Sequence, residues 1–297
     1  MKVGTHSFID NDRPFVVECF CGSGRLTAAF RQHGFDAFGF DLKNTRLQPE
    51  TPAVIVLDLT LPSDQQLLLE FCGHPRITYV HFAPPGGTAS RARETVVKHG
   101  PVPLRSTALP RGLPDLPARD AARVASANTL YDFVFKVVAL LTANGIMWSI
   151  ENPHASLFWW FEQARAMDSD SVISDVFFDH CMVGGLRPKR TRWRFFPPTA
   201  FGSLQVFCDR SHPHAQWGRA ENGKFAIAEE TVYPELLCNA VVRCVMRFSS
   251  WPATLHSLSS AREGLLRRPS CPLISVLLQA FRPVNPALPG SCLSSRT

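Results

Sequence analysis

The sequence has few of the features that mark secreted, membrane-spanning or disulfide-linked proteins. No apolar run reaches the ~18 residues that would cross a bilayer, and Met-Lys-Val-Gly-Thr at the start is not followed by a signal-peptide segment. We therefore expect neither membrane contact nor secretion, but an intracellular protein, nuclear or cytoplasmic. The nine cysteines form no CxxC pair, so their spacing indicates neither a zinc ribbon nor a disulfide framework, and no metal is expected.

Charge is also sparse, and it is unevenly placed. Charged residues make up 19% of the chain against 45% hydrophobic ones, which is enough apolar material for a packed core. Residues 249–297 hold five arginines and one glutamate, so most of the net charge of +6 lies there. The basic pI of about 9.0 is then weak support for nucleic-acid binding by the rest of the chain.

Short apolar runs alternate with segments of helical periodicity after a loose N-terminus, 1–13. Continuous apolar strands separated by helices are typical of a parallel sheet covered on both faces. We therefore predict an α/β domain over 14–248, followed by a Ser- and Pro-rich tail, 249–297, that we expect to be disordered. The predicted strands are 15–20, 38–41, 54–57, 77–82 and 146–150, with strand-like segments at 176–178 and 193–196. The predicted helices are 26–33, a helix that Ser63 could cap and that carries Leu67, Leu68 and Phe71, 121–143 and 235–247.

Unusual residues follow several of these strands. Ligands of open α/β sheets bind beyond the carboxyl ends of the strands, so these positions are the candidate site. They are Phe20-Cys21-Gly22-Ser23-Gly24, Asp41, Asp58, Ala83-Pro84-Pro85-Gly86-Gly87 and Glu151-Asn152-Pro153.

The first turn favours a nucleoside ligand. Gly22 and Gly24 permit close backbone approach, and Asp41, 19 residues beyond Gly22, could accept both hydroxyls of a ribose. Thr27 occupies the third position of the dinucleotide glycine motif. That argues against a pyrophosphate and for a ligand such as S-adenosylmethionine, with Asp58 accepting from the adenine amino group. The alternative is an ordinary turn with solvated acids.

The order of these motifs resembles the DNA cytosine-5 methyltransferases, and the loop from Ala83 to Arg93 is similar to a short branch of that family. Glu151-Asn152-Pro153 is similar to the family's Glu-Asn-Val, and residues 187–192 resemble its later basic motif. The resemblance covers roughly residues 14–248. It implies a Rossmann-like methyltransferase fold, S-adenosyl-L-methionine as cofactor and a nucleic-acid base as substrate, with DNA favoured over RNA.

The resemblance also implies roles for individual residues. Phe20, Gly22, Gly24, Asp41 and Asp58 would bind the cofactor. Pro84, Pro85 and Glu151 would form the catalytic loop and the group that holds N3 of the base. Arg91, Arg93, Arg187 and Arg190 would contact the nucleic acid.

One residue departs from the family. The position of its cysteine nucleophile, directly after Pro-Pro, is Gly86. The family adds a thiolate to carbon 6 to activate carbon 5 of cytosine, and glycine cannot do this. The loop also lacks the polar and aromatic ends of the Asp/Asn/Ser-Pro-Pro-aromatic loop of amino-methyltransferases.

Three features have alternative interpretations. Glu151 could simply cap a helix through 154–161. The basic set at 187–194 could be a solvated hairpin face. His212 and His214, two residues apart, could chelate a metal, but no CxxC or carboxylate partner is spaced to complete the set, so a structural or substrate-lining role is preferred.

Two functions follow from these observations. The first is a catalytically disabled methyltransferase relative that still binds cofactor or nucleic acid, which Gly86 favours. The second is an active nucleic-acid methyltransferase that uses another nucleophile or an amino-group mechanism. We expect a monomer in either case.

Overall fold

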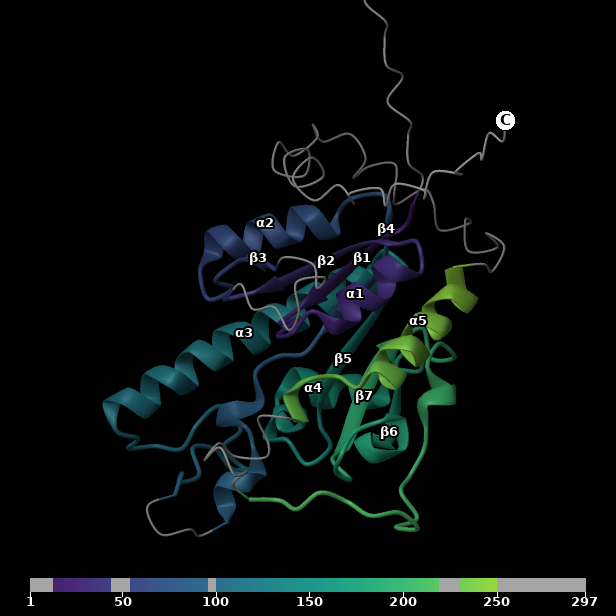
Figure 1. The fold of residues 1–297 in the computed structure, drawn as a ribbon. Coiled ribbons are helices and arrows are strands. Elements are labelled where there is room, and N and C mark those ends of the chain that lie inside the picture. The colour runs from purple at the N-terminus through teal and green to yellow at the C-terminus, as the bar shows by residue number, and fades with distance from the viewer. Residues whose placement is uncertain (1–12, 44–53, 96–99, 219–229, 250–297) are drawn as a thin grey trace, which may run out of the picture.

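A computed structural model describes residues 13–43, 54–95, 100–218 and 230–249. Its centre is a seven-stranded sheet of order β3-β2-β1-β4-β5-β7-β6 (Figure 1). The strands are β1 (Phe15–Cys19), β2 (Asp36–Asp41), β3 (Ile55–Val56), β4 (Ile77–Phe82), β5 (Met147–Pro153), β6 (Ser174–Asp179) and β7 (Arg190–Phe196). The first five are parallel, and β7 lies antiparallel between β5 and β6. This is the Rossmann-like methyltransferase fold that the sequence predicts.

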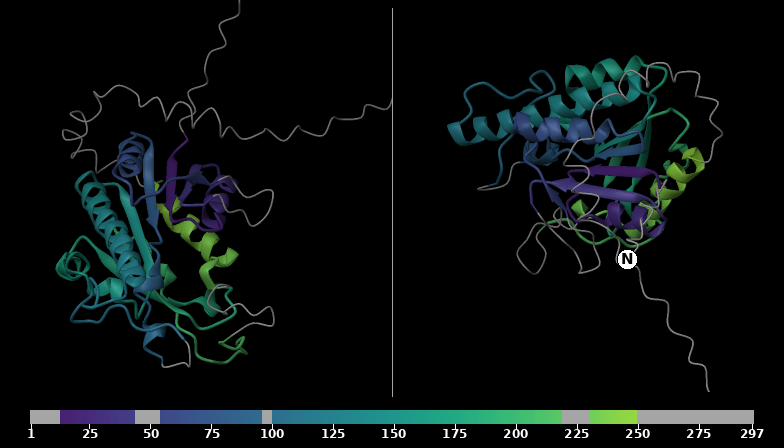
Figure 2. Two further views of the ribbon diagram at one scale, coloured as in Figure 1. Left: turned by 90° about the vertical axis from the view of Figure 1, so that its left-hand side faces the viewer. Right: turned by 90° about the horizontal axis from the view of Figure 1, so that it is seen from above.

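Helices cover both faces of the sheet, and each face has its own core (Figure 2). On one face lie α2 (Pro62–Cys72), α3 (Ala118–Ala143) and α4 (Glu162–Ala166). On the other lie α1 (Arg25–Gln32) and α5 (Glu235–Ser249), which pack against each other. The central strands are buried on both sides because helices cover both, which explains their unbroken apolar runs.

Helix α3 is long and apolar enough to cross a membrane by length and composition alone. Half of its most apolar window is buried inside the fold, where Val134, Val137 and Val138 belong to the core of that face. Packing on the sheet therefore accounts for its apolar character.

The element boundaries differ from the predicted ones mainly after β5. That strand runs on through Glu151 to Pro153, because β7 pairs with it along its whole length. The predicted helix through 154–161 is only a 3₁₀ turn, η3 (Leu157–Trp160), which Ser156 rather than Glu151 caps. Nearly all of the loose N-terminus, 1–13, and of the tail, 249–297, lies outside the described residues.

Candidate functional site

The strand order reverses between β1 and β4, and the predicted site residues follow the strands around this point. A reversal of this kind opens a crevice beyond the carboxyl ends of the two strands. The structure brings together the turn after β1, Asp41 at the end of β2, the loop after β4 and Glu151 in β5.

The turn after β1 is built from residues in the left-handed backbone region. Phe20, Gly22 and Gly24 have φ angles of 60°, 52° and 70°. Phe20 is strained there, since left-handed conformations are costly for aromatic residues and persist where the surroundings enforce them. A Cβ on Gly22 would meet nothing within 4 Å, so a ligand could approach its backbone closely.

Asp41 is tied to this turn. Its Oδ2 accepts a hydrogen bond from the N–H of Gly22 at 2.8 Å, and its Oδ1 accepts one from Leu42 at 2.7 Å. Each carboxylate oxygen has a further lone pair, so Asp41 can still accept two hydroxyl hydrogens. The first turn and the acid that would read a ribose are thus held as one unit.

Thr27 explains why the third glycine of the dinucleotide motif is absent. Its N–H and its hydroxyl both donate to Glu18 Oε2, and Glu18 is buried within β1. Burial raises the pKa of Glu18 to about 7, against the opposing effect of these hydrogen bonds. The sequence motif contained Glu18, but nothing in its spacing indicated a buried acid.

Asp58 stands at the start of the turn that leads into α2. Its Oδ1 accepts hydrogen bonds from the N–H and the hydroxyl of Thr60, and its own N–H donates to Asp64. Within the described part of the chain these bonds fall on one carboxylate oxygen, which leaves Oδ2 for a ligand. The structure therefore gives Asp58 a local turn role that a ligand contact could accompany.

The Pro84-Pro85 corner is held from two sides. The side-chain amide of Asn152 donates to Pro84 O at 2.9 Å, and the hydroxyl of Tyr131 donates to Pro85 O at 2.6 Å. Gly86 does not have a positive φ, so its backbone does not require glycine. A Cβ there would lie 3.3 Å from Asn152 Oδ1 and 4.0 Å from Pro153, with no sulfur of the described cysteines within 4 Å.

A buried arginine supports the loop after this corner. Arg105 is 1% exposed and donates to Thr88 Oγ1 at 3.0 and 3.2 Å and to the Asn128 side chain at 2.6 Å. It also lies over the ring of Tyr131. Arg105 was not among the predicted site residues, because nothing in the Pro-rich segment around it indicates which arginine turns inward.

Glu151 is buried within β5. Tyr233 donates to its Oε2 at 3.4 Å, and Lys189 Nζ lies 3.6 Å from its Oε1. Among the described residues no donor hydrogen-bonds to Glu151 Oε1 or to Asn152 Oδ1, although both are buried. Buried acceptors in folded proteins are usually hydrogen-bonded, so an ordered water or a polar ligand could complete these two.

Tyr233 links Glu151 to a hydrogen-bonded chain across the sheet. Its hydroxyl lies 3.0 Å from His81 Nε2, His81 Nδ1 lies 2.7 Å from Ser149 Oγ, and Ser149 lies 2.6 Å from the hydroxyl of Tyr79. Burial lowers the pKa of His81 to about 3, so this ring is neutral at ordinary pH. These hydrogen bonds hold the Tyr233 hydroxyl beside Glu151.

The four arginines expected to bind nucleic acid all have partners within the protein. Arg187 is buried and pairs with Glu230 at 3.0 Å, and Arg190 forms a two-bonded pair with Asp179. Arg93 donates to Gly87 O and Val102 O, and Arg91 pairs with Glu94 on the surface. Arg91 and Arg93 lie on the loop after the Pro-Pro corner, whereas Arg187 and Arg190 brace the β6–β7 region.

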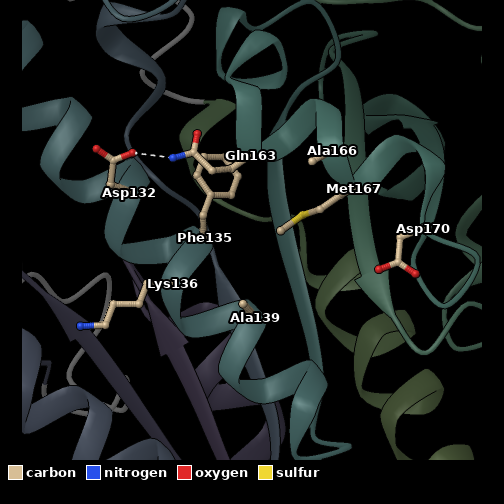
Figure 3. A pocket seen from close by; sticks show the side chains of 8 residues that line it. All are labelled: Asp132, Phe135, Lys136, Ala139, Gln163, Ala166, Met167 and Asp170. Carbon is tan, nitrogen blue, oxygen red and sulfur yellow. Dashed lines mark hydrogen bonds between the residues drawn. The ribbon is translucent and has the colours of Figure 1, made fainter.

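One cavity among the described residues does not coincide with this site. It has a volume of about 490 Å³ and lies between α3 and the segment after β5, as Figure 3 shows, lined by residues such as Asp132, Lys136 and Gln163. A smaller cavity of about 320 Å³ lies beside the start of α1, with Arg25, Gly184 and Glu230 among its lining residues. The first contains none of the strand-end residues, so we place the candidate site by the strand ends.

Comparisons with known proteins found solved structures with a similar fold, but no protein with a similar sequence among the families and curated proteins searched. No protein-family profile and no curated protein matches the chain. Similar solved structures include Entamoeba histolytica methyltransferase EhMeth (14% identity, TM-score 0.36), S. pombe Dnmt2 methyltransferase (12%, 0.39) and a Spodoptera frugiperda DNMT2 mutant (9%, 0.34). The matches cover 68%, 69% and 71% of this chain and 58%, 62% and 57% of theirs.

The chain thus spans less than two thirds of the length of these solved structures. They are methyltransferases of the kind that the sequence motifs resemble. The strand order and the parallel register of β1 to β5 define the fold of this chain.

Proposed function

We propose that the protein binds S-adenosyl-L-methionine, or its demethylated product, and a nucleic-acid base, and that it cannot methylate cytosine through a covalent adduct. The observation that carries the proposal is Gly86 at the position of the family's cysteine, beside the Pro84-Pro85 corner and in a fold that also brings Asp41 and Glu151 to the strand ends. Bound S-adenosylmethionine would supply an electrophilic methyl group. Asp41 and the turn at Gly22 would hold its ribose, and Asp58 would accept from its adenine amino group.

The base would enter beside the Pro84-Pro85 corner, with Glu151 facing it. The Glu151 carboxyl group can accept a hydrogen bond from the amino group of cytosine, and when it carries a proton it can donate that proton to N3. Asn152 holds the corner in place, and its Oδ1 is a second acceptor. A target base in duplex DNA would have to leave the stack to reach this position, at a cost of a few kcal/mol. We favour DNA over RNA on the family resemblance alone.

The alternative, an active enzyme with another nucleophile, gains no support from Cys21 and Cys72, the cysteines nearest to Gly86 in sequence. Cys21 and Cys72 are buried, and burial raises the pKa of both thiols, that of Cys72 to about 12. A thiol that stays protonated is a poor nucleophile.

Calorimetry with the full chain tests cofactor binding. We expect Asp41→Ala to raise the dissociation constant at least tenfold, since a hydrogen bond to a charged group contributes about 1.5–3 kcal/mol. Asp120→Ala, at an exposed ion pair on α3, is the control and should leave binding unchanged. Absence of binding to the unsubstituted chain at millimolar cofactor would refute the proposal.

Methyl transfer from labelled cofactor, measured on duplex DNA and on RNA, tests the second part. We expect no transfer to either. Methyl transfer by the unsubstituted chain would favour the alternative function. The proposal that the chain binds the cofactor would still stand in that case.

A further inference from the structure

A cluster of four possible metal ligands lies just beyond the carboxyl end of β6, the outermost strand, at the same edge of the sheet as the strand-end site. Cys181 belongs to the 3₁₀ turn η5 (His180–Val183), and Cys208, His212 and His214 lie on the segment after β7. Their ligand atoms, two sulfurs and two imidazole nitrogens, all lie within 4.8 Å of one another. Sequence spacing did not indicate this set, because Cys181 precedes the others by a whole strand.

The distances among Cys208, His212 and His214 are close to those of a tetrahedral site. His214 Nε2 lies 3.1 Å from His212 Nε2 and 3.3 Å from Cys208 Sγ, and Cys208 Sγ lies 3.9 Å from His212 Nε2. A tetrahedron with zinc–sulfur bonds of about 2.3 Å and zinc–nitrogen bonds of about 2.0–2.1 Å has edges of roughly 3.3–3.8 Å. The two histidine rings, with centroids 4.6 Å apart, both direct Nε2 into the cluster.

The surroundings also suit a thiolate ligand. The N–H of Arg210 donates to Cys208 Sγ at 3.2 Å, so the sulfur acts as an acceptor. Arg210 has a φ of 62°, which folds the turn back over that sulfur. The N–H of Cys208 itself donates to Asp179, which the Arg190 guanidinium holds in turn. Groups that orient a ligand in this way are typical of built metal sites.

We propose that Cys181, Cys208, His212 and His214 bind one zinc ion. Two thiolates and two neutral imidazoles form a closed set with no position left for water or substrate, and sulfur–nitrogen tetrahedra select zinc among common divalent metals. The site is therefore structural.

Its place in the fold indicates what it stabilises. Residues 208–217 contain no helix or strand, and two backbone-directed bonds, Ala215 N–H to Leu186 O and Arg187 Nε to Gln216 O, hold their far end. Arg187 also pairs with Glu230, and Lys189 lies beside Glu151. Zinc would join this segment to the end of β6 and so fix the connection that carries Arg187 and Lys189.

Metal analysis of the full chain, without a histidine tag and purified without chelator, tests the site. We expect about one zinc per chain. His214→Gln and Cys208→Ser should lose most of it, whereas His33→Gln, at an exposed histidine on the end of α1, should retain it. Cobalt substitution gives an independent signal, since tetrahedral Co²⁺ with thiolates shows visible d–d bands and a sulfur-to-metal charge-transfer band.

The expected cobalt spectrum disappears in Cys208→Ser and persists in His33→Gln. If Cys208→Ser does not fold, His212→Gln and His214→Gln test the same set with smaller changes. Three results would overturn the proposal: no zinc or cobalt bound by the unsubstituted chain, metal retained in all ligand variants, or a Cys181–Cys208 disulfide in the freshly purified protein.

Discussion

Gly86 is the residue on which the chemistry depends. In the expected reaction a thiolate adds to carbon 6 of cytosine, carbon 5 attacks the methyl group, and loss of the carbon 5 proton expels the thiolate. In 5-fluorocytosine a fluorine replaces the hydrogen at carbon 5, so no proton can be removed there. An enzyme with the thiolate therefore remains covalently bonded to a duplex that contains this base. The unsubstituted chain should form no such adduct, which denaturing electrophoresis would show.

Gly86→Cys is the matched variant. Its φ is one that cysteine adopts, and the new Cβ would need Asn152 Oδ1 to yield by only a few tenths of an ångström. We expect a covalent band with 5-fluorocytosine DNA in this variant and none in Gly87→Cys, where a Cβ meets nothing within 4 Å. An adduct with Gly86 unsubstituted would mean that another cysteine has taken the role.

The sequence predicted where single site residues lie in the fold better than it predicted which residues they contact. Gly22, Asp41 and the Pro-Pro corner could be placed because each directly follows an apolar strand. The partners of Glu151 could not, since Tyr233 is 82 residues away and Lys189 directly precedes β7, which pairs with β5. The basic motif was similarly ambiguous, because arginines that brace a fold and arginines that bind phosphate look alike in sequence.

At the scale of the elements, a row of buried hydrogen bonds links β4, β5 and the residues before α5. It runs from Tyr79 through Ser149 and His81 to Tyr233. Tyr233→Phe removes one hydroxyl and leaves His81 Nε2 buried without its partner, at an expected cost of about 1–3 kcal/mol. Ser149→Ala interrupts the same chain on the other side of His81. Urea unfolding of both single variants and the double variant should show a smaller combined loss than the sum.

Tyr131→Phe is the control for this double-mutant comparison of Ser149→Ala and Tyr233→Phe. Its hydroxyl bonds Pro85 O, and it shares no hydrogen-bond partner with Tyr233 in the described structure. Its effect should therefore add to that of Tyr233→Phe. Strict additivity of Ser149→Ala and Tyr233→Phe would instead show that the bonds act independently.

Predicted elements were most accurate where strands are central. The strand at 77–82 was predicted as found, because burial on both faces leaves an unbroken apolar run. The extension of β5 through Pro153 was not predictable, since it depends on pairing with β7, 37 or more residues later. Local pattern carries no information about such long-range pairing.

For the whole molecule, the described fold is closed by α5. This helix follows the last strand in the sequence, and it buries Leu237, Val241 and Val245 against the sheet and α1. We expect a chain that ends at residue 249 to keep its melting temperature within a few degrees of the full chain, while its pI falls because the removed arginines are absent. Loss of cooperative melting would show that residues 250–297 contribute to the core.

The stability of the whole fold should also depend on pH through Glu18. Its pKa is raised by burial from 4.5 to about 7, so between these values the folded chain keeps a proton that the unfolded chain has released. The stabilisation from this proton is complete below about pH 4.5 and is lost as pH rises toward 7. His81 acts in the opposite sense, because its pKa is lowered from 6.5 to about 3 and the unfolded chain binds the extra proton. The two effects oppose each other in the unsubstituted protein.

Glu18→Gln separates them. Glutamine can still accept both hydrogen bonds from Thr27 but cannot ionise, so the free energy of unfolding of the variant should rise relative to the unsubstituted chain as pH goes from 4.5 to 7. Urea unfolding at half-unit pH intervals measures this difference. Glu162→Gln, at an exposed glutamate that begins α4, should run parallel to the unsubstituted chain. Parallel curves for Glu18→Gln as well would mean that Glu18 ionises alike in the folded and unfolded chain, and that its carboxylate is solvated by more than Thr27.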